Sequence, residues 1–303
     1  MIEEEVQDQF KRGTLFICAT PIGNLKDITL RTLECLQAVD LIAVEKVERS
    51  RKLLSAYGIS AALISYREAN RKKSSKFILG KLKEGKRVAL ITDAGMPLIS
   101  DPGHYLIELL VEEGLTYTVL PGPSAALTAL VLSAYPCKRF VFMGFLERKK
   151  AARRKVLESL KEEENAVIFY ESPHRLLKTL QEMEEIFGSR EIAVCRELTK
   201  LFEEIKRGAP LELIDYYSEN PPRGEITLVL APHIRDPGGR SRNGLIEDNS
   251  EKLKEKIRYM LMKEIGNGYA PGEAVKKTAR FFSLSRNEVY SLYLRFKKLG
   301  LLE

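Results

Sequence analysis

Short apolar runs alternate with segments of helical periodicity along the first part of this 303-residue chain, and this alternation leaves few possible folds. The runs expected to form strands are 15–19, 41–44, 63–66, 88–92 and 117–120. Between the first two, Leu30, Leu33 and Leu36 recur at the spacing of one helix face, and a short helix is expected at 51–57. Uninterrupted apolar strands separated by helices are typical of a largely parallel sheet covered by helices on both faces.

A second group of apolar runs follows and predicts a second sheet. Its expected strands are 140–143, 166–170, 192–195 and 226–230. A chain of this length is expected to form two or three compact domains. The composition then changes at 233–250, a polar stretch that contains Pro237-Gly238-Gly239 and has almost no periodicity, so we predict a linker there.

The last segment, 251–303, has helical periodicity. Apolar residues recur along one face from Leu253 to Ile265, Pro271 suits a first helical position, and Ser285–Glu288 has the pattern of a capping box. Two short helices joined by a tight turn fit a helix-turn-helix that contacts phosphate. They fit a small bundle used for packing or dimerisation equally well, and the sequence does not decide between the two.

The formal net charge of +7 and the pI near 9.1 favour a polyanionic partner. One group of cations, predicted to bind RNA, places six within eight residues: Arg148, Lys149, Lys150, Arg153, Arg154 and Lys155. A second group lies at 71–76. Because a solvated helix face usually mixes both signs of charge, these unmixed groups indicate contact with phosphates.

The scattered cysteines and the three histidines argue against disulfides and against a metal site. Cys18, Cys35, Cys137 and Cys195 form no C-x-x-C pair and are expected to be buried thiols in a reducing compartment. No apolar run is long enough to cross a bilayer, and the acidic N-terminus does not resemble a secretory signal. We therefore expect a cytoplasmic protein with no metal and no membrane partner.

Two apparent motifs are rejected by their context. Gly80–Lys86 fits G-x-x-x-x-G-K, but Arg87 replaces the required Ser or Thr, and the segment precedes a strand instead of following one. Gly122–Ala126 resembles a nucleophile elbow, but its last position is Ala and few histidines are available as a base. Neither a phosphate-binding loop nor a serine hydrolase is expected.

Three loops of unusual composition follow predicted strands, at Thr20–Asn24, Thr92–Gly103 and Pro121–Ala125. In open α/β sheets, ligands bind where the carboxyl ends of the strands and their loops meet. Small residues let a ligand approach the backbone, and the helices expected after the last two loops can add N–H donors. We predict a ligand site with 92–97 as one wall.

These loops, in this order, closely resemble those of the ribosomal RNA small subunit methyltransferase I family, within the tetrapyrrole methylase superfamily. The resemblance covers Gly13 to Ala231 and is carried by the segments 19–25, 100–103, 121–126, 144–146, 169–175, 196–200, 203–204 and 223–225. It implies two αβα domains of the tetrapyrrole methylase type, at 13–122 and 123–232, with S-adenosylmethionine in the cleft between them. It also implies a homodimer.

The resemblance further implies the reaction, which is methyl transfer to the ribose 2′-hydroxyl of a cytidine in the decoding region of 16S rRNA. The implied partner is 16S rRNA or the small ribosomal subunit. By similarity, the residues expected to bind the cofactor are Pro21, Thr92, Asp93, Gly95, Ser124, Ala125 and Tyr170.

Methyl transfer needs aligned reacting atoms, and the weakly acidic hydroxyl needs a base or a nearby cation. The candidates are Asp101, Glu197, Lys200 and Glu204. Glu197 and Glu204 could equally be surface residues in salt bridges, and the sequence does not choose among the four.

The chain departs from the family pattern in three loops expected at the cleft. The departing residues are Lys46, Val47, Glu48, Arg67, Ala69 and Met96. The family usually has Glu-Asp-Thr-Arg at the first loop, so Lys46 reverses a charge. Two other functions stay open: an RNA-binding relative with lost or shifted activity, and a small-molecule tetrapyrrole methylase, which would leave the groups of cations unexplained.

Overall fold

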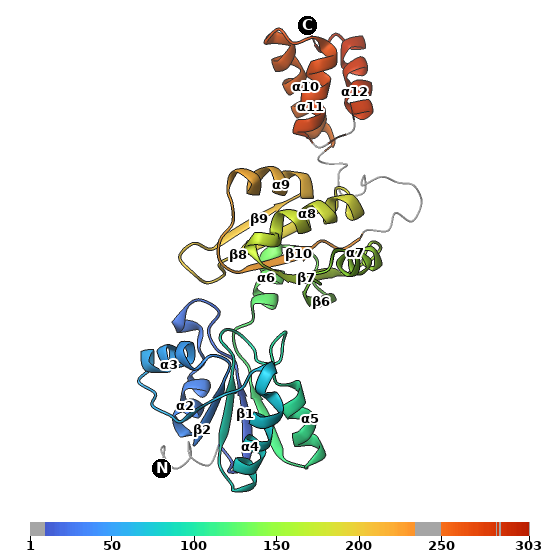
Figure 1. Cartoon of the computed structure of the whole chain (residues 1–303). Helices are drawn as coiled ribbons and strands as arrows, with labels where there is room; N and C mark the ends of the chain where they lie inside the picture. The colour runs from blue at the N-terminus through green and yellow to red at the C-terminus, as the bar shows by residue number, and fades with distance from the viewer. Residues whose placement is uncertain (1–9, 234–249, 283, 285, 303) are drawn as a thin grey trace. The chain divides into compact units, whose positions relative to one another are not determined.

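The computed structural model describes residues 10–233, 250–282, 284 and 286–302. The chain forms two compact units, Met1–Ile234 and Arg235–Glu303, and each is described by itself. Both predicted sheets belong to the first unit and the last three helices to the second (Figure 1). Most of the predicted linker lies outside the described residues.

The first sheet has five strands in the described part of the chain and is parallel throughout, as predicted. Its elements in chain order are β1 (Thr14–Cys18), η1 (Leu25–Asp27), α2 (Leu30–Ala38), β2 (Leu41–Val44), α3 (Val47–Ala56), β3 (Leu63–Ser65), η2 (Glu68–Asn70), α4 (Arg71–Lys83), β4 (Val88–Ile91), α5 (His104–Glu112) and β5 (Thr116–Leu120). The strand order is β3-β2-β4-β1-β5. Helix α3 begins earlier than predicted, because Val47 packs against the same core as Leu54.

Alternate residues of these strands face opposite helical layers. Leu15 and Ile17 pack with α4 and α5, whereas Phe16 and Cys18 pack with α2 and α3. Burial on both faces explains why the apolar runs are uninterrupted. Because the strands are parallel, the loops that follow β1, β2 and β4 all leave from one edge of the sheet.

The second sheet is mixed. Its elements are α6 (Ala125–Ser133), β6 (Phe140–Phe145), α7 (Lys150–Ser159), β7 (Ala166–Glu171), α8 (Pro173–Phe187), β8 (Ile192–Arg196), β9 (Glu204–Gly208), α9 (Pro210–Glu219) and β10 (Ile226–Leu230). The order is β6-β7-β10-β8-β9, and β10 runs antiparallel to both of its neighbours. Helix α6 covers one face, and α7, α8 and α9 cover the other. Ile22, from the first loop, packs into the core beneath α6 and so joins the two halves.

Strand β9 was not predicted. Its sequence, Glu-Ile-Lys-Arg-Gly, contains no apolar run, and it is a strand because it pairs with β8 as the outer member of a hairpin. One predicted catalytic residue, Glu204, is therefore the first residue of an edge strand.

The second unit contains α10 (Ser250–Gly266), α11 (Pro271–Phe281) and α12 (Arg286–Lys298). The three helices share one apolar core, to which Leu261, Val275 and Val289 contribute fully buried side chains. A small bundle is thus observed, whereas phosphate contact by these helices stays a prediction. Ser285 of the predicted capping box lies outside the described residues.

Three of the cysteines, Cys18, Cys35 and Cys195, are buried free thiols as predicted. Cys137 is exposed, which corrects the prediction for that residue. Across the described residues, no helix has the length and apolar character required to span a bilayer. No group of metal-ligating side chains occurs in this part of the chain either.

Candidate cofactor and substrate site

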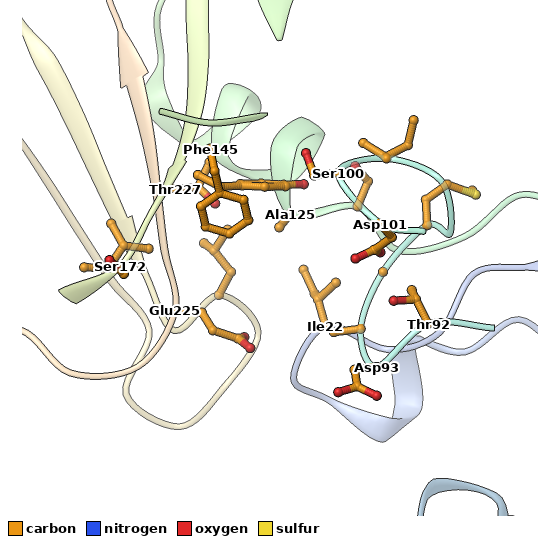
Figure 2. A pocket seen from close by; sticks show the side chains of 18 of the residues that line it. Ile22, Thr92, Asp93, Ser100, Asp101, Ala125, Phe145, Ser172, Glu225 and Thr227 are labelled. Carbon is orange, nitrogen blue, oxygen red and sulfur yellow. The ribbon is translucent and has the colours of Figure 1, made fainter. Parts of the chain in front are cut away.

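A cavity of about 430 Å³ lies where the loops after β1, β2 and β4 meet the second sheet (Figure 2). Its volume falls within the range of small-molecule sites. Figure 2 shows Thr92, Asp93 and Asp101 on one side and Phe145 and Thr227 on the other. All predicted cofactor-binding residues line the cavity except Pro21, which is buried beside it, and its neighbour Ile22 lines it instead.

The first two predicted loops are held together by their backbones. The N–H of Thr20 donates to the carbonyl of Gly95 at 2.9 Å, and the N–H of Gly95 donates back to Thr20 at 3.0 Å. The hydroxyl of Thr20 donates to the carbonyl of Thr92 at 3.2 Å. Gly95 has a φ of 82°, which a residue with a side chain adopts only under strain. This pairing gives the wall around Asp93 a fixed position.

Asp93 has one carboxylate oxygen available for a ligand. Its Oδ2 accepts from Lys46 at 3.0 Å and from Arg49 at 3.1 Å. Its Oδ1 is buried and has no hydrogen-bond partner among the described residues. Because a buried acceptor without a donor is costly, this oxygen fits a hydroxyl or amino group of a bound molecule.

The opposite wall combines small and aromatic side chains. Ser124 forms the N-cap of α6, and its hydroxyl accepts from the N–H of Leu127, so Ala125 lies at the first turn of the helix. The ring of Tyr170 packs against Phe142 and Phe145, with centroids 5.1 and 5.5 Å apart. Burial raises the pKa of the Tyr170 hydroxyl. The rings meet at 72° and 59°, and together they form an apolar wall of the cavity.

Asp101 is the one predicted catalytic candidate that lines the cavity. The pKa of this carboxyl is raised to about 6, mainly by burial. A hydrogen bond with Thr92 lowers the pKa, and the nearby carboxylates of Glu45 and Asp93 raise it. A carboxylate with a pKa near the working pH is a better base than an ordinary Asp.

Glu197 and Lys200 lie in the loop between β8 and β9, where they form a salt bridge at 2.8 Å. Lys200 also pairs with Glu225 at 2.9 Å. Burial of Glu197 is outweighed by its hydrogen bonds to Lys200 and to the N–H of Glu225, so its pKa is lowered. Burial of Lys200 is likewise outweighed by its two carboxylate partners, and its pKa is raised. Neither shift produces a base at neutral pH, and we assign this pair a role in holding the loop.

Glu204 accepts from Arg196 at 2.8 Å and from the hydroxyl of Tyr216 at 2.6 Å. These bonds outweigh its burial and lower its pKa. Glu204 is also absent from the cavity lining. The structure therefore supports a salt-bridge role for Glu204 over a catalytic one.

The predicted RNA-binding group is divided by the structure. Arg153 is 2% exposed and its guanidinium pairs with Glu182 at 2.5 and 2.6 Å, so it cannot reach a phosphate and the prediction is wrong for this residue. Arg154 pairs with Glu158 and Glu185 on the surface. The remaining members are exposed, and they are Arg148, Lys149, Lys150 and Lys155.

Of the residues that depart from the family pattern, some line the cavity and others do not. Lys46 and Met96 line the cavity, and Lys46 belongs to it through its salt bridge with Asp93. The other departing residues do not line the cavity, and they are Val47, Glu48, Arg67 and Ala69. The reversed charge at Lys46 is therefore compensated by a carboxylate that the site already contains.

Several lining residues were missed by the sequence reasoning. Glu45 lines the cavity from the loop after β2 and Arg49 from the first turn of α3, and Thr227 is a buried polar residue within the apolar strand β10. A polar residue inside an otherwise apolar run was the one available signal for Thr227. No comparable signal marks Glu45, because its role depends on its distance from Asp101.

The sequence model of the Tetrapyrrole (Corrin/Porphyrin) Methylases matches residues 14–213. Two relatives carry the description "Ribosomal RNA small subunit methyltransferase I". The one from Thermotoga maritima is 49% identical over 219 residues, which cover 72% of this chain and 98% of the relative. The one from Bacillus subtilis is 41% identical over 286 residues, which cover 93% of this chain and 94% of the relative.

The chain belongs to the ribosomal RNA small subunit methyltransferase I branch of the tetrapyrrole methylases. It is accordingly a methyltransferase that uses S-adenosylmethionine. Solved structures agree on the fold of this methylase. A cobalamin biosynthetic enzyme, cobalt precorrin-4 methyltransferase CbiF, has a TM-score of 0.58 at 19% identity, covering 72% of this chain and 95% of that one. Uroporphyrin-III-C-methyltransferase from Thermus thermophilus has a TM-score of 0.54 at 18% identity, covering 73% of this chain and 94% of that one.

Proposed function

We propose that this methylase transfers a methyl group to the ribose 2′-hydroxyl of a cytidine in the decoding region of 16S rRNA, in the cytoplasm. The observation that carries the proposal is a half-buried carboxyl in the wall of the cofactor cavity, that of Asp101, whose pKa of about 6 suits a base. S-adenosylmethionine, when bound, supplies an electrophilic methyl group. The relatives described above support small-subunit RNA as the substrate.

Some residues of the cavity bind the cofactor, and one accepts a proton. Asp93 Oδ1 accepts from a polar group of the cofactor, and Ala125 and Tyr170 enclose its adenosine end. Asp101 accepts the proton of the 2′-hydroxyl as the oxygen becomes a nucleophile. Lys46 and Arg49 hold Asp93 in place and bring positive charge to the mouth of the cavity.

Incubation with labelled S-adenosylmethionine and undermodified small ribosomal subunits tests the proposal. We expect label on one ribose of the 16S rRNA, located by partial alkaline hydrolysis, which 2′-O-methylation blocks at the modified position. Label on a base, or on an added tetrapyrrole in place of RNA, would show a shifted activity. Cofactor binding without any transfer to subunits would show that activity is lost.

Replacement of Asp93 by Asn should weaken cofactor binding about tenfold or more, because a charge-assisted hydrogen bond contributes about 1.5–3 kcal/mol. Isothermal titration calorimetry with S-adenosylhomocysteine measures this loss. Asp40→Asn, on the surface of the same unit, is the matched control and should bind normally. Equal affinity of D93N and the parent protein would contradict the assignment of Oδ1.

We also propose that the methylase is a homodimer. Helix α6 is apolar all round, yet Leu127 is 51% and Val131 is 74% exposed. The edge strands β5 and β6, which precede and follow α6 in the chain, also expose apolar side chains, including Val119 and Phe140. Edge strands and apolar helices of this kind are usually covered. A second copy of the chain, placing the same face against this one, covers them.

Replacement of Val131 by Asp should convert the dimer to a monomer, because burying an unpaired carboxylate at the interface is costly. We expect sedimentation velocity to show a dissociation constant raised at least tenfold. Val111→Asp, on α5, introduces the same charge at a valine that is 62% exposed elsewhere and should leave the mass unchanged. A dimer that survives V131D would place the interface on another surface.

A further inference from the structure

A second, larger hollow adjoins the cofactor cavity. It has a volume of about 1080 Å³ and lies between the loop after β6 and the first turns of α8. Its cationic lining comes from the loop, from α7 and from α8, with His174 beside it; the cations are Arg148, Lys149, Arg153, Arg175 and Lys178. Glu147 is the one carboxylate in the described lining. The hollow is therefore strongly basic.

Two arginines fix the shape of this hollow. Arg175 donates to the carbonyls of Leu146 and Glu147 at 2.9 and 3.2 Å, and Arg153 donates to those of Glu147 and Arg148 at 3.1 and 3.2 Å. The charge of Arg153 is met by Glu182, and that of Arg175 lies 3.4 Å from Glu171. These two residues hold the loop and contribute little free charge.

The free charge comes from the other cations. Arg148, Lys149 and Lys178 are exposed, and none of them forms a salt bridge within the described residues. Three exposed cations without a salt bridge outnumber the single carboxylate of the lining, and their mutual repulsion is relieved when an anion is bound. Since the hollow exceeds the usual size of a small-molecule site, a polymeric anion fits it better than a single ion.

The hollow and the cofactor cavity share a border. Phe145 and Ser172 line both, and Phe145 is 59% exposed between them. An RNA strand that places one ribose beside Asp101 and continues past this border enters the hollow. The ring of Phe145 offers a face on which an unstacked base can lie, as in the recognition of single-stranded RNA.

We propose that this hollow binds the phosphodiester backbone of the RNA strand next to the target ribose, through Arg148, Lys149 and Lys178. The inference rests on the proposed function, because it takes the ribose at Asp101 as its reference point. The hollow thereby sets which nucleotide enters the cavity, while Arg153 and Arg175 hold the loop that carries Arg148 and Lys149.

The test compares two double variants that remove equal charge. Arg148→Ala/Lys178→Ala empties the hollow of two cations, and Lys150→Ala/Lys155→Ala removes two exposed cations of the same predicted group that do not line it. Binding to undermodified small subunits is measured against salt concentration, with S-adenosylhomocysteine present. We expect the first variant to bind at least tenfold more weakly, and its salt slope to fall by about 0.7 for each phosphate that it no longer neutralises. The second should resemble the parent protein.

Calorimetry with S-adenosylhomocysteine and a thermal unfolding curve show whether each variant is folded and keeps its cofactor site. Equal decreases in affinity in both double variants, or no decrease in either, would overturn the proposal, since the hollow would then have no special role. A decrease on subunits but not on protein-free 16S rRNA would overturn it in favour of an acidic ribosomal protein. Failure of the proposed function is a separate result, because the parent protein would then label no ribose.

Discussion

Asp101→Asn should lower kcat about a hundred- to ten-thousand-fold, the usual contribution of a general base. The Asn side chain has nearly the same shape but cannot accept the proton of the 2′-hydroxyl. Single-turnover transfer to undermodified subunits measures the decrease, and calorimetry should show unchanged affinity for S-adenosylhomocysteine. A variant that keeps full kcat would remove Asp101 from the chemistry.

The pH dependence gives an independent check on this residue. Because the base must be ionised, kcat of the parent protein should fall tenfold per unit as the pH drops below about 6. Glu45 raises the pKa of Asp101, so Glu45→Gln should move this fall to lower pH while the maximal rate is kept. The residual activity of Asp101→Asn should lack the fall altogether.

The stability of D101N shows whether Asp101 acts as a base or has a structural role. The pKa of Asp101 is raised in the folded protein, so its contribution to stability is present at low pH and is lost as the pH rises through about 6. Asn resembles the protonated acid, and D101N should therefore be at least as stable as the parent protein at neutral pH. A loss of both stability and activity would indicate a structural residue.

The parts of the fold that could be predicted are those whose burial is visible in the sequence. Strands such as β4 and β10 are buried on both faces and are apolar almost throughout. The antiparallel direction of β10 could not be predicted, because an apolar run has no direction. Strand β9 could not be predicted either, since its pairing with β8 and not its composition makes it a strand.

The site, too, has features that local sequence reveals and features that it does not. The loops around Asp93 and Ser124 were recognisable, because Gly, Pro and small residues after a strand mark a ligand site. What each charged residue does there depends on neighbours distant in the chain. The pKa of Asp101 is raised by its partial burial and by the nearby carboxylates of Glu45 and Asp93. Arg153 lies in the middle of a basic segment yet pairs with Glu182. Neither relation leaves a trace in local sequence.

Arg153 gives the largest expected effect on stability. Arg153→Met keeps most of the apolar volume but leaves Glu182, whose side chain is 4% exposed, without its partner. The loss of one member of a buried ion pair costs about 3–5 kcal/mol, and the carbonyls of Glu147 and Arg148 also lose a donor. Urea unfolding of the full chain should show this decrease in the transition of the first unit.

Two further variants decide whether the cost comes from an unpaired buried charge. Arg153→Met/Glu182→Leu removes both charges and should regain most of the lost stability, because an apolar pair of similar volume can replace a buried ion pair. Arg154→Met, next along α7, breaks only exposed pairs with Glu158 and Glu185 and should leave the transition nearly unchanged. If Arg153 instead reached RNA from the surface, R153M would be as stable as R154M and would lose salt-dependent affinity for small subunits. We expect the opposite result. R153M should be much less stable than R154M, and its affinity for small subunits should fall only because the loop that carries Arg148 and Lys149 is no longer held.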